Sequence, residues 1–188
     1  SPPAEFTAPR RVLPVLVLAQ LAGTSPWFAV NAVMADLQRS HGLGEGAVGT
    51  LTSALQLGFI VGTLVFALFS VADRWPARRV FLVCALAASA CTLAAAASAG
   101  SFGALLGWRA LTGVCLAGIY PVGMKIAAAC YPQGLGRALG WLVGALVLGT
   151  ASPHALRALG THWPWPTVML AVSALAAATV PAVASAQS

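Results

Sequence analysis

Six apolar segments, each long enough to cross a membrane as a helix, constrain the fold of this chain more than any other feature. They lie near residues 12–35, 46–71, 79–99, 102–129, 137–158 and 166–184, and turn-forming residues separate them. An α-helix needs about 20 residues to cross roughly 30 Å of hydrocarbon, and only helices or closed barrels satisfy their backbone hydrogen bonds there. The apolar runs lack the alternation of a barrel strand. The sequence therefore predicts an all-α integral membrane protein, a bundle of six transmembrane helices over residues 12–184.

Charge is sparse and lies in the gaps between these segments. Only 7% of the residues are charged, against roughly 25% in a soluble domain. The net charge of +6 does not line one exposed face, so we expect no nucleic-acid partner. With residues 1–11 as a cytoplasmic tail, the basic residues concentrate inside, as the positive-inside rule requires. Inside lie Arg10, Arg11, Arg74, Arg78, Arg79, Lys125 and Arg137, and outside lie Arg39 and Arg157. We expect a multi-pass protein of the inner (plasma) membrane, with a second short tail at residues 185–188.

The two halves of the chain resemble each other weakly. Gly42-Leu43-Gly44 leads into the second segment and Gly134-Leu135-Gly136 into the fifth, and several Ala, Leu and Gly positions that follow also match. Chance matching in an Ala/Leu/Gly-rich chain is the alternative. A true repeat makes segments one to three recur as four to six with opposite membrane orientation. Inverted three-helix repeats are a transporter architecture, with the solute site near the midplane.

The gap between the second and third segments carries the most specific motif. It runs from Phe69 to Arg79 and contains Asp73, Arg74 and Arg78. It resembles the signature that the major facilitator superfamily carries between helices two and three, although Phe69 and Pro76 stand where glycines are usual. A carboxylate at this membrane edge can accept charge-assisted hydrogen bonds from arginines. Asp73, Arg74 and Arg78 are therefore expected to act as a conformational latch; a basic loop that only sets topology is the alternative.

Arg109 in the fourth segment is the second motif residue. The pattern Arg109-x3-Gly113-x4-Gly118-x2-Pro121 resembles the helix-four motif of the same superfamily. At about 1.5 Å per residue, Arg109 lies roughly 10 Å inside the membrane, where a charge indicates a functional site. We expect it to bind substrate, with Tyr120 on the same helical face. Snorkelling to the outer interface or bonding to backbone carbonyls are the alternatives.

Polar and aromatic residues form a stripe on the first segment. Gln20, Thr24, Trp27, Phe28 and Asn31 fall on one side of a helix, and Gln56 with Ser53 forms a weaker pair on the second segment. We expect Gln20, Thr24, Trp27, Asn31 and Gln56 to line a solute pathway; hydrogen bonding between helices is the alternative. Two glycine series, Gly58-x3-Gly62 and Gly136-x3-Gly140-x3-Gly144, are typical of close helix packing.

The resemblance implies one six-helix half of a major facilitator transporter. It implies transport of a small solute by alternating access together with a second six-helix half. Either a homodimer supplies that half, or this chain is the N-terminal piece of a longer protein. In a homodimer, Asp73 is expected to meet the partner's fifth helix near residues 134–137. Arg109 favours an anionic or zwitterionic solute, and the four acidic residues lie at or outside the membrane edges. A non-transporting membrane scaffold or regulatory subunit is the alternative function.

Enzymatic chemistry is not expected. The sequence shows no Ser/His/Asp grouping, no metal-ligand spacing and no pair of buried acids, so we expect no cofactor and no metal.

Overall fold

The computed structural model describes residues 12–27, 36, 38–39, 42–98, 100–159, 164, 167–168, 170–171 and 174. Within these residues every regular element is helical. The elements are α1 (Val12–Thr24), η1 (Ser25–Trp27), α3 (Ala47–Leu68), α4 (Val71–Arg74), α5 (Ala77–Ala97), α6 (Phe102–Leu116), α7 (Tyr120–Cys130) and α8 (Leu135–Leu159). The two tails, residues 28–35 and nearly all of the sixth apolar segment lie outside the described residues.

Three of the described helical stretches are long and apolar enough to cross a membrane. They are Ala47–Leu68, Ala77–Ala97 and Phe102–Cys130. The α3 helix also exposes a row of large apolar side chains, among them Leu57, Val61 and Leu64. Large apolar side chains are stable in contact with lipid, whereas in a soluble protein their exposure to water is unfavourable. The described part of the chain is therefore an all-helical membrane fold.

Prolines interrupt two of the predicted segments. The α1 helix ends at Thr24 and a single 3-10 turn follows, because Pro26 disfavours the helical conformation at Ser25. The fourth segment was expected to be one helix over residues 102–129, but a turn at residues 117–119 divides it into α6 and α7. Pro121 has no N–H to donate to the carbonyl of Ala117, so the helical hydrogen-bond ladder stops there.

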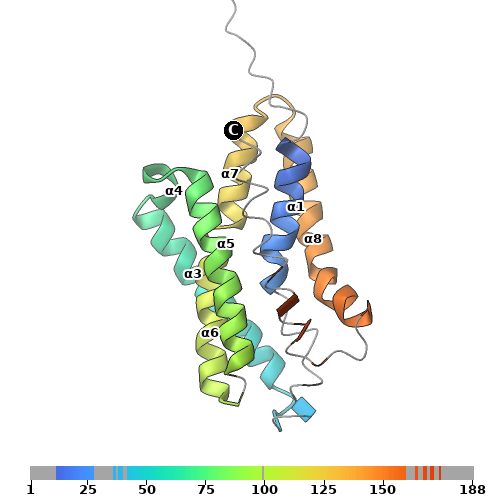
Figure 1. The fold of residues 1–188 in the computed structure, drawn as a ribbon. Helices are drawn as coiled ribbons and strands as arrows, with labels where there is room; N and C mark the ends of the chain where they lie inside the picture. The colour runs from blue at the N-terminus through green and yellow to red at the C-terminus, as the bar shows by residue number, and fades with distance from the viewer. Residues whose placement is uncertain are drawn as a thin grey trace, which may run out of the picture.

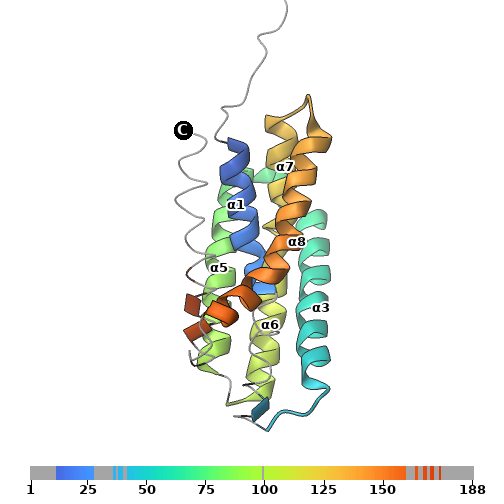
Figure 2. The same cartoon turned by 90° about the vertical axis from the view of Figure 1, so that its right-hand side faces the viewer.

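Segments far apart in the sequence lie side by side. In Figures 1 and 2, α8 packs along α1, and α5 adjoins both α6 and α7. The α3 helix packs against α6. Phe81 of α5 is fully buried at the centre of the main apolar core, to which α1, α3, α5, α7 and α8 all contribute. The core therefore joins the α1–α8 pair to the α3–α6 pair.

Backbone-to-backbone approach holds α3 against α6. A methyl group added to Gly58 would overlap the carbonyl oxygen of Ala110, and one added to Gly113 would overlap that of Leu55. By contrast, a methyl group at Gly136, Gly140 or Gly144 would have no neighbour within 4 Å among the described residues. The first glycine series therefore brings two helices together, and the second does not do so within the described part of the chain.

We expect Gly58→Ala to destabilise the fold, because its methyl group has no space between α3 and α6. Overpacking of this kind costs about 1–3 kcal/mol. Gly49→Ala, on the same helix, is the matched control, since an added methyl group there meets nothing within 4 Å. Thermal unfolding in detergent compares the two, and equal midpoints would show that the close approach contributes nothing.

Candidate functional site

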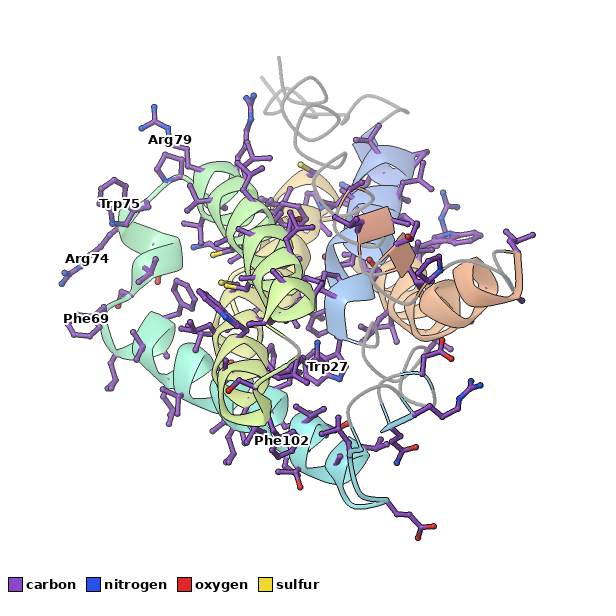
Figure 3. All side chains as sticks on the ribbon, turned by 60° about the horizontal axis from the view of Figure 1, so that its bottom comes forward. Trp27, Phe69, Arg74, Trp75, Arg79 and Phe102 are labelled. Carbon is purple, nitrogen blue, oxygen red and sulfur yellow. The ribbon has the colours of Figure 1, made fainter. Side chains whose placement is uncertain are left out.

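A cavity of about 360 Å³ lies where α1, α3, α6, α7 and α8 meet. Its wall consists of Thr24, Trp27, Phe59, Leu116, Tyr120, Leu146 and Val147. The rings of Trp27 and Phe59 meet edge to face, with centroids 5.1 Å apart and planes at 68°. Figure 3 shows Trp27 between the helices, whereas Trp75 points outward at the corner formed by α4. Three residues expected from the sequence to bind solute, Thr24, Trp27 and Tyr120, therefore share one cavity.

The wall of this cavity is apolar and aromatic, with a few polar groups. Among the described residues that line it, none is charged. The polar groups are the Thr24 hydroxyl, the Trp27 indole N–H and the Tyr120 phenol, and the Thr24 hydroxyl donates to the carbonyl of Gln20 at 2.7 Å. A pocket of this size with a few polar groups on an apolar wall suits a small organic molecule.

Arg109 lies beside this cavity rather than in its wall. Its side chain is only 1% exposed. Its two terminal nitrogens donate hydrogen bonds to the carbonyls of Pro26 and Trp27, each at 2.8 Å, so the structure shows the bonding to backbone carbonyls that the sequence left open. These two carbonyls belong to the 3-10 turn that follows α1. The planar guanidinium can satisfy two adjacent acceptors at once, which an ammonium group cannot do in the same way.

The two hydrogen bonds make Arg109 a positioning residue for Trp27. The Trp27 carbonyl accepts from Arg109 on α6, and the Trp27 ring packs against Phe59 on α3. The backbone and ring of Trp27 are thus held from two helices. Arg109 therefore acts on the cavity through Trp27.

The other expected solute-binding residues do not line the cavity. Gln20 is fully buried one turn before Thr24, and its amide atoms have no hydrogen-bond partner among the described residues. It occupies the space left by Gly123, where an added methyl group would overlap the Gln20 oxygen. Gln56 lies on the exposed face of α3, and Asn31 lies outside the described residues. The structure thus groups Thr24, Trp27 and Tyr120 and separates Gln20 and Gln56 from them.

Asp73 pairs with a residue that the sequence had identified only as a topology signal. Its carboxylate accepts from the ammonium group of Lys125 on α7. In the described residues, neither Arg74 nor Arg78 forms an ion pair with Asp73, and Figure 3 shows Arg74 pointing outward. Lys125 lies at the middle of α7 (Tyr120–Cys130), and only the packing of α7 beside α4 brings its ammonium group to Asp73.

Sequence reasoning also missed the apolar half of the cavity wall. This part of the wall consists of four apolar residues: Phe59, Leu116, Leu146 and Val147. The buried stripe of α3, at Leu51, Leu55, Gly58 and Gly62, turns the neighbouring Phe59 inward. The spacing of these buried residues can be read from the sequence. Phe59 was missed because the sequence analysis selected site residues by their polar side chains.

We expect Arg109→Lys and Arg109→Ala both to destabilise the fold. Each hydrogen bond from a charged donor contributes about 1.5–3 kcal/mol, and the alanine variant loses both. Arg79→Ala is the control, because Arg79 is exposed and an exposed substitution shifts stability by about 0.5 kcal/mol or less. Denaturant unfolding in detergent measures the difference, and an Arg109→Ala variant as stable as Arg79→Ala would contradict the positioning role.

Comparison with known proteins identifies the family and the fold. The family model of the Major Facilitator Superfamily matches residues 16–185. A chloramphenicol resistance protein of Streptomyces lividans is 35% identical over 167 residues, which are 88% of this chain and 41% of that protein. The crystal structure of a bacterial homolog of the human lysosomal transporter Spinster, inward-facing and unoccupied, matches with a TM-score of 0.72 and 18% identity over 98% of this chain and 43% of its own.

The last likeness shows the fold alone, and this chain spans less than half the length of either relative. The family match covers most of the chain, and the resemblance seen in the two sequence motifs is confirmed. The chain belongs to the Major Facilitator Superfamily of membrane transporters.

Proposed function

We propose that this chain takes part in moving a small, uncharged, amphipathic solute across the membrane by alternating access. Family membership supports transmembrane solute transport, and the observation that carries the solute class is the aromatic cavity at Trp27 and Phe59, whose described wall holds no charged side chain. The relative named for chloramphenicol resistance points the same way, since chloramphenicol is an uncharged aromatic amide with hydroxyl groups.

An anionic or zwitterionic solute is the alternative that the sequence favoured. It rested on Arg109, whose terminal nitrogens are occupied by the carbonyls of Pro26 and Trp27. The Nε of Arg109 has no hydrogen-bond partner among the described residues, but Arg109 does not line the cavity, whose described wall is uncharged. The neutral solute is therefore the better match to the described structure.

A second six-helix half, from a longer protein of which this chain is the N-terminal part or from a second copy, completes the proposed transporter. Val147 lines the cavity yet is 61% exposed, so the cavity is open on the α8 side and another wall would close it. Two inverted three-helix repeats are also supported: Gly42 and Gly134, at matching positions, both have left-handed φ values of 62° and 85°. The α3–α6 and α8–α1 pairs correspond under the same repeat.

The ion pair of Asp73 and Lys125 is proposed as the latch of one transport conformation. It ties α7 to the short helix α4, and both side chains are exposed, so its contribution to overall stability is only about 0–1 kcal/mol. The same free energy can still shift the balance between two conformations about fivefold. In a homodimer, crosslinking Asp73 to the partner's residues 134–137 would test the expected contact between copies.

Asp73→Asn and Lys125→Gln should each slow transport in liposomes that contain the assembled transporter, with little change in thermal midpoint. Reversing both charges, Asp73→Lys with Lys125→Asp, should restore much of the rate because the pair re-forms. Arg79→Gln is the control at the same membrane end. Wild-type transport rates in both single variants would contradict the proposal that this ion pair is a latch.

Trp27→Ala should weaken chloramphenicol binding about tenfold or more, because a buried aromatic contact contributes about 1.5–3 kcal/mol. Trp75→Ala is the matched control, since Trp75 is 60% exposed and lies away from the cavity. Equilibrium dialysis of the purified protein against labelled chloramphenicol, followed by uptake into liposomes, measures binding and transport. Thermal unfolding of both variants checks that they are folded.

Chloramphenicol succinate, which carries a carboxylate, separates the alternatives in the same assay. Binding of the succinate but not of the neutral drug would favour the anionic solute. Absence of binding and transport for both compounds would favour a scaffold or regulatory role.

A further inference from the structure

Gln20 carries a fully buried side-chain amide where α1 packs on α7. The side chain is 0% exposed, and neither its Nε2 nor its Oε1 has a hydrogen-bond partner among the described residues. Because no part of the side chain is exposed, a second six-helix half cannot reach the amide in this conformation. Burial without partners costs the full desolvation of both atoms, a cost that an apolar side chain of the same shape would avoid. The amide therefore destabilises the packing in which it lies.

The surroundings of the amide offer it little. A methyl group added to Gly123 of α7 would lie 2.4 Å from the Oε1 of Gln20, and the Phe81 ring adjoins the same position. The N–H of Gly123 donates to the carbonyl of Ile119 at 2.8 Å and is not available. A buried water molecule needs about two to four polar partners, which an aromatic ring and a helical glycine do not supply. The contact of Gln20 with Gly123 is therefore close but weakly bonded.

Both helices that meet at this contact are interrupted one turn away from it. The α1 helix ends at Thr24, one turn after Gln20. The α7 helix begins at Tyr120, after a turn in which the N–H groups of Gly118 and Ile119 donate to carbonyls three residues back, each at 3.0 Å. Short 3-10 stretches of this kind within a longer helical segment often mark hinges. Each helix thus has a break about which it can turn beside the contact.

The two breaks also pack on each other and adjoin the central cavity. A methyl group added to Gly23 would lie 3.2 Å from the Cγ2 of Ile119, so the end of α1 rests on the turn before α7. Thr24 and Tyr120, at the same level, line the cavity. Separation of α1 from α7 at this level would bring water and the polar groups of the cavity wall within reach of the Gln20 amide.

We propose that Gln20 promotes the separation of α1 from α7 during transport. In the packed state its amide has no partner in the described structure, whereas after separation it can hydrogen-bond to water, to the Thr24 hydroxyl or to the Tyr120 phenol. A group that is satisfied in only one of two states shifts the equilibrium toward that state. This inference rests on the proposed transport function, and it names the contact at which this half of the transporter changes shape.

The test replaces Gln20 by methionine, which has a similar length and no hydrogen-bond donor. In the purified full chain in detergent, Gln20→Met should slow backbone hydrogen exchange at residues 17–24 and 119–126 about tenfold, because the packed state no longer contains the unsatisfied amide. Gln56→Met is the matched control, since Gln56 is exposed on α3, and it should leave exchange in both segments unchanged. Gln20→Leu serves if Gln20→Met does not fold.

Transport in liposomes that contain the assembled transporter is the second measurement, and Gln20→Met should slow it about tenfold as well. Unchanged or faster exchange in Gln20→Met would overturn the proposal, because the amide would then have stabilised the packed state. Slower exchange with a wild-type transport rate would also overturn it, since the separation would not serve transport. Slower exchange in Gln20→Met, combined with a wild-type protein that moves none of the tested solutes, would support the separation of the helices and contradict only the proposed function.

Discussion

The hydrogen bonds from Arg109 to the broken end of α1 set the geometry on which the central cavity depends. A charge within the membrane is tolerated only with polar partners, and the carbonyls of Pro26 and Trp27 in the turn after α1 supply them. The same contact ties α6 to the chain after α1 and holds Trp27 at its level. The arginine of the second sequence motif thus bonds to the backbone of a neighbouring segment.

The packing of α3 on α6 supplies the other side of that cavity. Gly58 and Gly113 allow the two backbones to touch, and Phe59, the residue after Gly58, meets the Trp27 ring. Gly113 lies one turn after Arg109 on the same helix, so one face of α6 both approaches α3 and bonds to the end of α1. A small change in the distance between α3 and α6 would therefore change the contact between the rings of Trp27 and Phe59.

The central cavity and a second one, between the first turns of α1 and α8, differ in chemistry. The central one has an uncharged described wall, because an unpaired charge at that depth is costly. The one between α1 and α8 combines the charged Arg137 with Trp141 and Tyr131. The ion pair of Asp73 and Lys125 belongs to the same end of the bundle, where exposed charges can exchange partners at little cost.

By itself the sequence determined the helical, membrane-embedded character and the family, because apolarity, chain breaks and motif spacing are local properties. It also marked Thr24, Trp27 and Tyr120, which prove to share one cavity wall. Only the tertiary structure decided that Arg109 bonds to carbonyls more than 80 residues away, that Lys125 reaches Asp73, and that Phe59 completes the site. Helical periodicity assigns a residue to a face, but which face meets which depends on where glycines let helices approach and where prolines end them.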